Sequence, residues 1–342
     1  MSHGIDQEYG AGRMTTGQAV LRRHFAWDNH SCMPLRPGDE TFIAQLGRLR
    51  EAGVDAVTLN IGFGEQTPEE HLGVIAWFRE WLARHDDLYL IVASPADLDR
   101  AATSDRMAVM FDIEGARGIG DRLDLIGHYR ALGVIWMLVA YNRANLAGGG
   151  CLDPVDAGLS AFGRAMVAEM NRVGMMVCLS HCGERTAYEA LDASTKPVII
   201  SHSNCRALFD HPRNVSDDLI RACAAQGGVI GINGLGDFLA PSGADLVAAV
   251  VAHVDHVVQL VGPEHVGISL DYVWDQDELR AFLQTMPDLF PDGFPDPLPL
   301  VAPEAWPAIV DGLLARGYDE RALAMVAGGS WRRVAMENWR EG

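Results

Sequence analysis

The sequence predicts an α/β fold, a TIM-like (β/α)8 barrel in a single domain with helical additions at its C-terminal end. Two observations support this prediction. Short apolar segments alternate with amphipathic helical segments, which is the pattern of βαβ units around a parallel sheet. The length of 342 residues suits one large barrel, and no repeat or shift in composition marks a boundary. We assign residues 1–20 to an N-terminal extension and residues 287–342 to a proline-rich loop and terminal helices.

Nine runs of apolar and β-branched residues are predicted strands. They are 25–30, 56–61, 88–93, 107–113, 134–141, 175–180, 197–201, 228–232 and 266–270. Predicted helices lie between most of them, at 40–52, 68–84, 121–132, 157–173, 216–226 and 244–261, and three more follow at 304–316, 320–327 and 330–339. A barrel needs eight strands, so we expect one of the nine to be peripheral.

Charge and cysteine content narrow the function classes. The formal net charge is −19, which argues against nucleic acid and anionic membrane as partners. Residues 1–16 lack the apolar stretch of a signal peptide, no apolar run would span a bilayer, and six scattered cysteines show no paired framework. We therefore expect a cytoplasmic protein. Lys196, the only lysine, precedes a predicted strand, so we expect it at the end of the barrel opposite any ligands.

Candidate functional residues fall where strands end, which is where the chemistry of such barrels lies. Three histidines and two carboxylates occupy these positions: His30, Glu114, His181, His202 and Asp271. Imidazole and carboxylate suit Zn²⁺, and a carboxylate can bridge two ions. Each residue alone has an ordinary structural alternative, such as a hydrogen-bonded histidine or a helix cap. Their joint placement favours a metal site.

With these residues the chain resembles the membrane (renal) dipeptidase family of zinc metallopeptidases, in particular its soluble bacterial-type members. The resemblance runs from about Phe25 to Trp339. It rests on Ile113-Glu114-Gly115, Leu179-Ser180-His181, the run from Ile200 to Ala207, the run from His211 to Asp218, and Gly227-Gly228-Val229-Ile230-Gly231.

The resemblance implies a zinc-dependent dipeptidase with two ions per chain, a small dipeptide as substrate, often with a D-residue at its C-terminal position, and a homodimer in many members. A metal-bridging hydroxide would attack the peptide bond. By motif match His30 would bind one ion, Glu114 would bridge, and His181 and His202 would bind the second ion. Asp271 would be the general acid/base. Arg213 would bind the substrate carboxylate, although a salt bridge to the start of the helix at 216–226 is its ordinary alternative.

Two positions depart from the family. Its first motif, Asp-Gly-His-x-Asp, here reads Asp28-Asn29-His30-Ser31-Cys32. Cys32 shares the strand face of His30 and its thiolate can bind zinc, although a small core residue is its commoner role. Asp28 shares that face, earlier in the strand. After the fifth strand the best-known members have a histidine that polarises the scissile carbonyl. This chain has Tyr141-Asn142, either of which can donate to an oxyanion.

These departures leave two rival functions. One is a related metallohydrolase acting on another carboxylate-bearing amide, such as a β-lactam or an N-acyl amino acid. The other is a metal-binding protein with a degenerate site. Some barrel metal hydrolases bridge their two ions with a carbamylated lysine. The lone lysine excludes that kind of site here, because we expect Lys196 at the opposite end of the barrel from the predicted ligands. Glu114 must then be the bridge.

Overall fold

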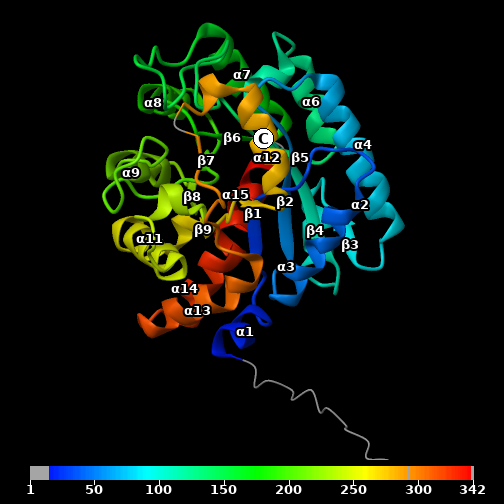
Figure 1. Cartoon of the computed structure of the whole chain (residues 1–342), viewed down its shortest axis with the longest axis vertical. Coiled ribbons are helices and arrows are strands. Elements are labelled where there is room, and N and C mark those ends of the chain that lie inside the picture. The colour runs from blue at the N-terminus through cyan, green and yellow to red at the C-terminus, as the bar shows by residue number, and fades with distance from the viewer. Residues whose placement is uncertain (1–14, 292, 340–342) are drawn as a thin grey trace, which may run out of the picture.

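The computed structural model describes residues 15–291 and 293–339, and a parallel sheet forms its centre (Figure 1). The strands are β1 (Trp27–Cys32), β2 (Ala56–Phe63), β3 (Tyr89–Ile91), β4 (Met107–Glu114), β5 (Val134–Leu138), β6 (Met176–Cys178), β7 (Ile199–Ile200), β8 (Val229–Ile232), β9 (Val266–Ile268) and β10 (Tyr272–Val273). Their order is β10-β1-β2-β4-β5-β6-β7-β8-β9. Because β10 follows β9 in the chain and pairs with β1, the two ends of the sheet meet and a TIM-like barrel results.

All nine predicted strands form, and β3 is the peripheral one. It pairs only with β4, beside Met107–Val109, and lies off the path of the other strands. The sheet gains β10, which sequence patterning did not predict. Two residues are too short a run to carry a local signal, and β10 exists because Ser31 and Cys32 of β1 pair with it.

Helices surround the sheet. They are α1 (Thr16–Leu21), α2 (Glu40–Ile43), α3 (Gly47–Glu51), α4 (Pro68–Arg84), α5 (Pro95–Ala101), α6 (Asp124–Ala131), α7 (Ala161–Val173), α8 (Glu184–Ala193), α9 (Asp217–Ala225), α10 (Gly236–Leu239), α11 (Leu246–Val261), α12 (Gln276–Thr285), α13 (Trp306–Ala315), α14 (Glu320–Ala324) and α15 (Ser330–Trp339). Short 3-10 segments are η1 (Ala44–Leu46), η2 (Ala116–Ile119), η3 (Pro263–His265), η4 (Pro287–Leu289) and η5 (Pro303–Ala305), and η6 (Met325–Gly329) is a π-helical turn.

Helix α4 matches its prediction because both of its boundaries have local signals. The Thr67 side chain accepts from the backbone N–H of Glu70, and the Glu70 side chain accepts from the backbone N–H of Thr67. Pro68 is the first residue of the helix, where its fixed φ is favourable. The helix predicted at 40–52 is instead broken into α2, η1 and α3. The helix predicted at 320–327 stops at Ala324 and continues as the π-helical turn.

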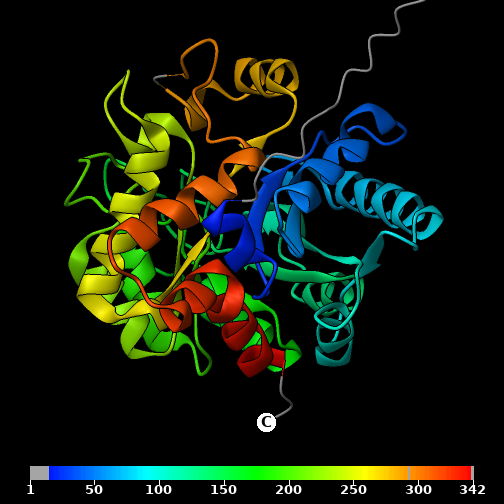
Figure 2. The same cartoon turned by 90° about the horizontal axis from the view of Figure 1, so that it is seen from below.

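The two ends of the barrel are closed differently (Figure 2). Helix α15 packs Trp331 and Val334 against the apolar interior residues Trp27 and Trp136, and so plugs one end. Lys196 lies at this end, where its Nζ donates to the carbonyl of Asn338 on α15 at 2.5 Å. At the opposite end α12 and the proline-rich segment after it stand over the strand termini (Figure 2).

The N-terminal part of the described chain also packs on the barrel domain. The backbone N–H of Gly17 in α1 donates to Asp311 Oδ1 of α13 at 2.7 Å. Of the predicted extension, residues 1–14 lie outside the described residues. Among the described residues, no helix combines the length and the apolar character needed to cross a lipid bilayer.

Candidate active site

The structure brings all five predicted metal-binding residues together at the carboxyl ends of the strands. His30 and Cys32 come from β1 and Glu114 from β4, while His181 and His202 follow β6 and β7. The Glu114 carboxylate is central. Its Oε1 lies 3.4 Å from His30 Nε2, 3.4 Å from His181 Nε2 and 3.0 Å from His202 Nε2. Residues far apart in sequence thus share one carboxylate oxygen.

Three overlapping ligand groups result, each with its ligand atoms within 4.8 Å of one another. They are His30 with Cys32 and Glu114, Glu114 with His181 and His202, and His30 with His202 and Asp271. Glu114 belongs to two of these groups, one on the β1 side and one on the β6/β7 side. A carboxylate between two sets of donors has the position of a bridging ligand.

The hydrogen bonds behind two of the imidazoles fix which nitrogen faces the cluster. His30 Nδ1 donates to Asp112 Oδ2 at 3.1 Å, and His181 Nδ1 donates to Asn142 Oδ1 at 2.6 Å. The Asn142 amide is oriented because its Nδ2 donates to the carbonyl of Leu289 at 2.9 Å. The Nε2 atoms of both rings therefore face the Glu114 carboxylate. This set of N, O and S donors suits zinc.

His202 completes the β6/β7 side. Its Nδ1 lies 2.8 Å from Ser201 Oγ, and its Nε2 lies 2.9 Å from His181 Nε2. The His202 ring stacks on the ring of His30 with centroids 4.2 Å apart. The stack joins the two sides of the cluster into one packed unit.

Cys32 and Asp271 form the β1 edge of the cluster. Cys32 Sγ lies 3.5 Å from His30 Nε2 and 3.2 Å from Asp271 Oδ1. Asp271 Oδ2 accepts from Asn233 Nδ2 at 2.7 Å, and its backbone N–H donates to the carbonyl of His30. One oxygen of Asp271 is thus held by Asn233 while the other faces the cluster.

Asp28 is held elsewhere. Its carboxylate accepts from the backbone N–H of Leu270 at 2.9 Å and from Trp306 Nε1 at 3.4 Å. Burial raises the pKa of Asp28 to about 7. Asp28 joins none of the ligand groups found among the described residues.

Three site residues adopt left-handed backbone conformations that are uncommon outside glycine. Asn142, His181 and Asp271 have φ values of 56°, 62° and 54°. They are the only non-glycine residues with positive φ in the described part of the chain. Such strain concentrates at functional sites, because the surrounding structure must hold it in place.

The buried imidazoles differ in pKa although their chemistry is the same. Burial opposes the charged form of His30, but the negative charges of Asp112 and Glu114 outweigh it and raise its pKa well above the usual value. Burial lowers the pKa of His181 well below the usual value, and the positive charge of Arg213 adds to this. The β1 side is therefore the more negative side of the cluster.

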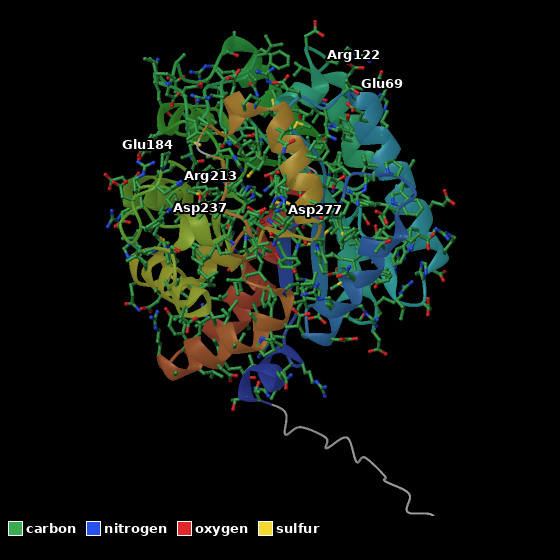
Figure 3. All side chains as sticks on the ribbon, in the orientation of Figure 1. Glu69, Arg122, Glu184, Arg213, Asp237 and Asp277 are labelled. Carbon is green, nitrogen blue, oxygen red and sulfur yellow. The ribbon has the colours of Figure 1, made fainter. Side chains whose placement is uncertain are left out.

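A cavity opens onto the cluster, and Arg213 lines its wall. Arg213 is 4% exposed. Its Nη2 donates to the carbonyl of His202 at 3.2 Å and its Nη1 donates to Ser203 Oγ at 3.4 Å. Its Nε is buried without a partner among the described residues. Arg213 lies on the half of the molecule formed by α8, α9 and α11 (Figure 3).

The ordinary alternative for Arg213 is not realised. Asp217 pairs with His256, and Asp218 pairs with Arg221. Arg213 has only neutral hydrogen-bond acceptors in the bonds just described, so its charge is available to a carboxylate in the cavity.

Tyr141 and Asn142 differ in their surroundings. The Tyr141 ring stacks on His181 with centroids 4.1 Å apart and lines the cavity. Burial and the charges of Glu114 and Asp271 raise the Tyr141 pKa well above the usual value, so its hydroxyl keeps its proton. Asn142 is buried, and its amide donates to Leu289 rather than into the cavity.

Sequence patterning missed two side chains that support the cluster. Asp112 shares the β4 face of Glu114 at a spacing of two, which was a usable signal. Asn233 follows β8, and only its contact with Asp271 reveals its role. Sequence patterning also missed the phenylalanines around the cavity, which come from β2, α10, α12 and the proline-rich segment.

A family comparison accounts for this combination of fold and site. The model of the membrane dipeptidase family (peptidase family M19) matches residues 17–340. The chain belongs to this family.

Several curated dipeptidases are similar to this chain in sequence. Dipeptidase verJ of Clonostachys rogersoniana is 33% identical over 257 residues, which are 74% of this chain and 61% of that protein. An uncharacterised dipeptidase of Schizosaccharomyces pombe is 33% identical over 198 residues, 55% of this chain and 47% of that protein. The match spans about half the length of several of these curated dipeptidases.

Solved structures agree with the membrane dipeptidase fold. An amidohydrolase from Pseudomonas aeruginosa superposes with a TM-score of 0.85 at 27% identity, covering 95% of this chain and 99% of that one. A metallopeptidase from Rhodobacter sphaeroides, bound to a phosphinate mimic of L-Ala-D-Ala, gives a TM-score of 0.75 at 21% identity over 92% of this chain and 99% of that one. The latter likeness concerns the fold alone.

Proposed function

We propose that the chain is a zinc-dependent dipeptidase that binds two ions per chain with Glu114 as the bridge. The observation that carries this proposal is the placement of Glu114 Oε1 within 3.4 Å of three imidazole Nε2 atoms, beside a cavity with a buried arginine. His30 and Cys32 would hold the first ion, and His181 and His202 the second. Bound zinc would supply an activated water and would polarise the scissile carbonyl.

Asp271 is the proposed general acid/base. Its Oδ1 faces the cluster beside His30 Nε2 at 3.3 Å, and Asn233 restrains its other oxygen. In this position Asp271 accepts a proton from the attacking water and delivers it to the leaving amine. The restraint by Asn233 and the left-handed backbone keep that oxygen directed at the reacting atoms.

Arg213 and Tyr141 are the proposed substrate contacts. Arg213 is buried with an unpartnered Nε and binds the free carboxylate of the dipeptide. Tyr141 stays protonated beside His181 and donates a hydrogen bond to the oxyanion that develops on the scissile carbonyl.

Asn142 acts on the reaction through His181. Its Oδ1 accepts from His181 Nδ1, which fixes the ring and directs Nε2 at Glu114. The alternative role as an oxyanion donor would require the amide to leave Leu289. We therefore propose Asn142 as a positioning residue.

The test is a dipeptide panel assayed with zinc-loaded protein, in which each sequence is offered as the L,L and the L,D form. Hydrolysis of dipeptides, with kcat/KM lowered when Arg213 is changed to alanine, is the expected result. No hydrolysis of any dipeptide by protein that holds zinc would exclude the proposal.

A second candidate is a related hydrolase of another carboxylate-bearing amide, such as a β-lactam or an N-acyl amino acid. It is favoured by Tyr141, which occupies the position where the best-known members have histidine. Adding one substrate of each kind to the panel separates the two candidates. Failure to retain zinc after dialysis would instead support a degenerate site. A cytoplasmic location and a homodimer stay predictions.

A further inference from the structure

The cavity above the ligand cluster is bordered by a continuous series of aromatic rings, here called the aromatic wall. Its members are Phe238, Phe294, Phe290, Tyr141, Phe63 and Phe282. In that order each ring contacts the next, with centroid separations of 5.8, 5.6, 5.9, 5.7 and 5.3 Å. Such separations are those of favourable aromatic pairs, so the wall is one packed surface.

The wall is assembled from segments far apart in the sequence. Phe63 ends β2 and Tyr141 follows β5, while Phe238 lies in α10. Phe282 belongs to α12, and Phe290 and Phe294 belong to the proline-rich segment after it. These last two elements stand over the strand termini (Figure 2) and bring three of the six rings to the cavity.

We propose that the aromatic wall selects dipeptides in which both residues carry large apolar or aromatic side chains. This inference rests on the proposed dipeptidase function and specifies its substrate class. Its physical basis is that a cavity lined by six rings removes a large side chain from water, and a methyl group gains little there.

The end of the wall at Phe238 lies beside the proposed carboxylate anchor. The Arg213 guanidinium carbon is 5.3 Å from the centroid of the Phe238 ring. A dipeptide whose carboxylate is bound by Arg213 therefore places its C-terminal side chain beside Phe238 and Phe294. Leu235 and Leu298 pack against these rings in the same apolar cluster.

The other end of the wall serves the N-terminal residue. The pair Phe63 and Phe282 ends the series of rings opposite Phe238, which is the ring that contacts Arg213. Beyond Tyr141 the rings of Phe63 and Phe282 meet edge to face at 5.3 Å. The side chain on the amino side of the scissile bond fits against this pair.

The acidic groups near the mouth are held by an arginine of the protein itself. Asp275 and Glu278 line the cavity, but Arg36 binds both carboxylates, at 2.7 and 3.1 Å. Glu278 also accepts from the backbone N–H of Leu35. Arg36 thus holds both carboxylates at the mouth, and the rings form most of the remaining surface that is offered to a substrate side chain.

The experiment compares Ala-Ala, Ala-Phe, Phe-Ala and Phe-Phe with the zinc-loaded protein, each in the stereochemical form that is hydrolysed. We expect each phenylalanine to raise kcat/KM by about 10- to 100-fold over alanine at the same position. Phe238→Ala should remove most of the gain at the C-terminal position, and Phe282→Ala most of the gain at the N-terminal position. Phe238→Leu keeps an apolar side chain at this position and serves as the second variant if Phe238→Ala does not fold. It should keep part of the gain in kcat/KM at the C-terminal position.

Phe162→Ala is the matched control, because Phe162 is a half-buried phenylalanine of α7 outside the cavity lining. It should leave all four values unchanged. If Ala-Ala is hydrolysed as well as Phe-Phe, or if neither wall variant alters the preference, the inference is wrong and the dipeptidase function stands. If none of the four is hydrolysed and the wider dipeptide panel also fails, both are wrong.

Discussion

The two sides of the ligand cluster use the same carboxylate but differ in charge and in support. On the β6/β7 side His181 and His202 are backed by neutral groups, the Asn142 amide and the Ser201 hydroxyl. On the β1 side His30 is backed by the carboxylate of Asp112. Burial lowers the pKa of His181, whereas the negative charges around His30 raise its pKa despite burial.

From this difference we expect the two proposed ions to bind with unequal affinity. The β1 side has Asp112, Asp271 and a cysteine, and burial raises the Cys32 pKa well above its usual value. A cation bound there would lower the cost of ionising the thiol. The β6/β7 side lacks such charges and depends on Glu114. The first four predictions below test the two sides of the cluster, and the last concerns a buried histidine outside it.

The largest effect is expected for Glu114→Gln, which weakens both sides at once. We predict that the zinc content falls from two ions to one or fewer per chain and that kcat/KM falls by about 10⁴-fold, since the charge stabilisation by the ions is lost. Metal analysis and steady-state kinetics measure this. Glu69→Gln, at an exposed position of α4, is the control. Retention of both ions with near-normal activity would contradict the bridging role.

Asp271→Asn should lower kcat by about 10³-fold and leave the zinc content at two ions, because a proton-transfer group is lost and the ligands stay. Kinetics and metal analysis of the same preparation measure this. Zinc loss in parallel with activity would show instead that Asp271 is a ligand of the third group, with His30 and His202.

Cys32→Ala and His181→Ala should each remove one ion, from opposite sides of the cluster, and lower kcat/KM by about 10²-fold. The cobalt-substituted protein distinguishes the sides. A sulfur-to-cobalt charge-transfer band should be present in the unaltered protein and in His181→Ala, and absent in Cys32→Ala. A band that survives in Cys32→Ala would mean that the thiol is no ligand.

Asn142→Ala should weaken zinc binding on the β6/β7 side by about 10- to 100-fold, the usual effect of losing the group that orients a ligand imidazole. Competition with a chelator measures the affinity. Asn142→Asp keeps an acceptor for His181 Nδ1 and should restore most of it. Equal losses in both variants would point to the contact with Leu289 as the important one.

The smallest effect is on stability and concerns His71, a buried imidazole outside the cluster with no carboxylate behind it. Burial lowers the pKa of His71 to about 4. In the unfolded chain His71 takes up a proton near pH 6.5, and in the folded chain only near pH 4. The contribution of neutral His71 to the free energy of unfolding is therefore fully present above about pH 6.5 and is lost as the pH falls from 6.5 to 4. Thermal unfolding from pH 4 to 7 measures this.

In the matched pair, His71→Gln should remove that part of the pH dependence, while His128→Gln at an exposed site of α6 should preserve it. An unchanged pH profile in His71→Gln would assign the acid sensitivity to other groups.

The positions of the strands and of the ligands were predictable because both depend on local patterns. Apolar runs mark the nine strands, and Glu114 and His202 directly continue or follow such runs. Strand β10 was not predicted, because it is defined by its pairing with β1 rather than by its own two residues. Helix α12 was not predicted either.

The supporting groups of the site were less predictable. Asn233 contacts Asp271 from a different strand end, and the rings of Phe63 and Phe282 meet only after the chain has folded. Contacts of this kind join residues more than 30 positions apart, and no periodicity in the sequence specifies them.

The most direct test of the central claim is a crystal structure of the zinc-loaded protein with a non-hydrolysable dipeptide analogue, with the metals located by anomalous scattering. Two anomalous peaks on either side of the Glu114 carboxylate, one within bonding distance of Cys32 Sγ, are the predicted result, together with the analogue's carboxylate on Arg213. A single peak that excludes Cys32, or no peak at Glu114, would contradict the two-ion site.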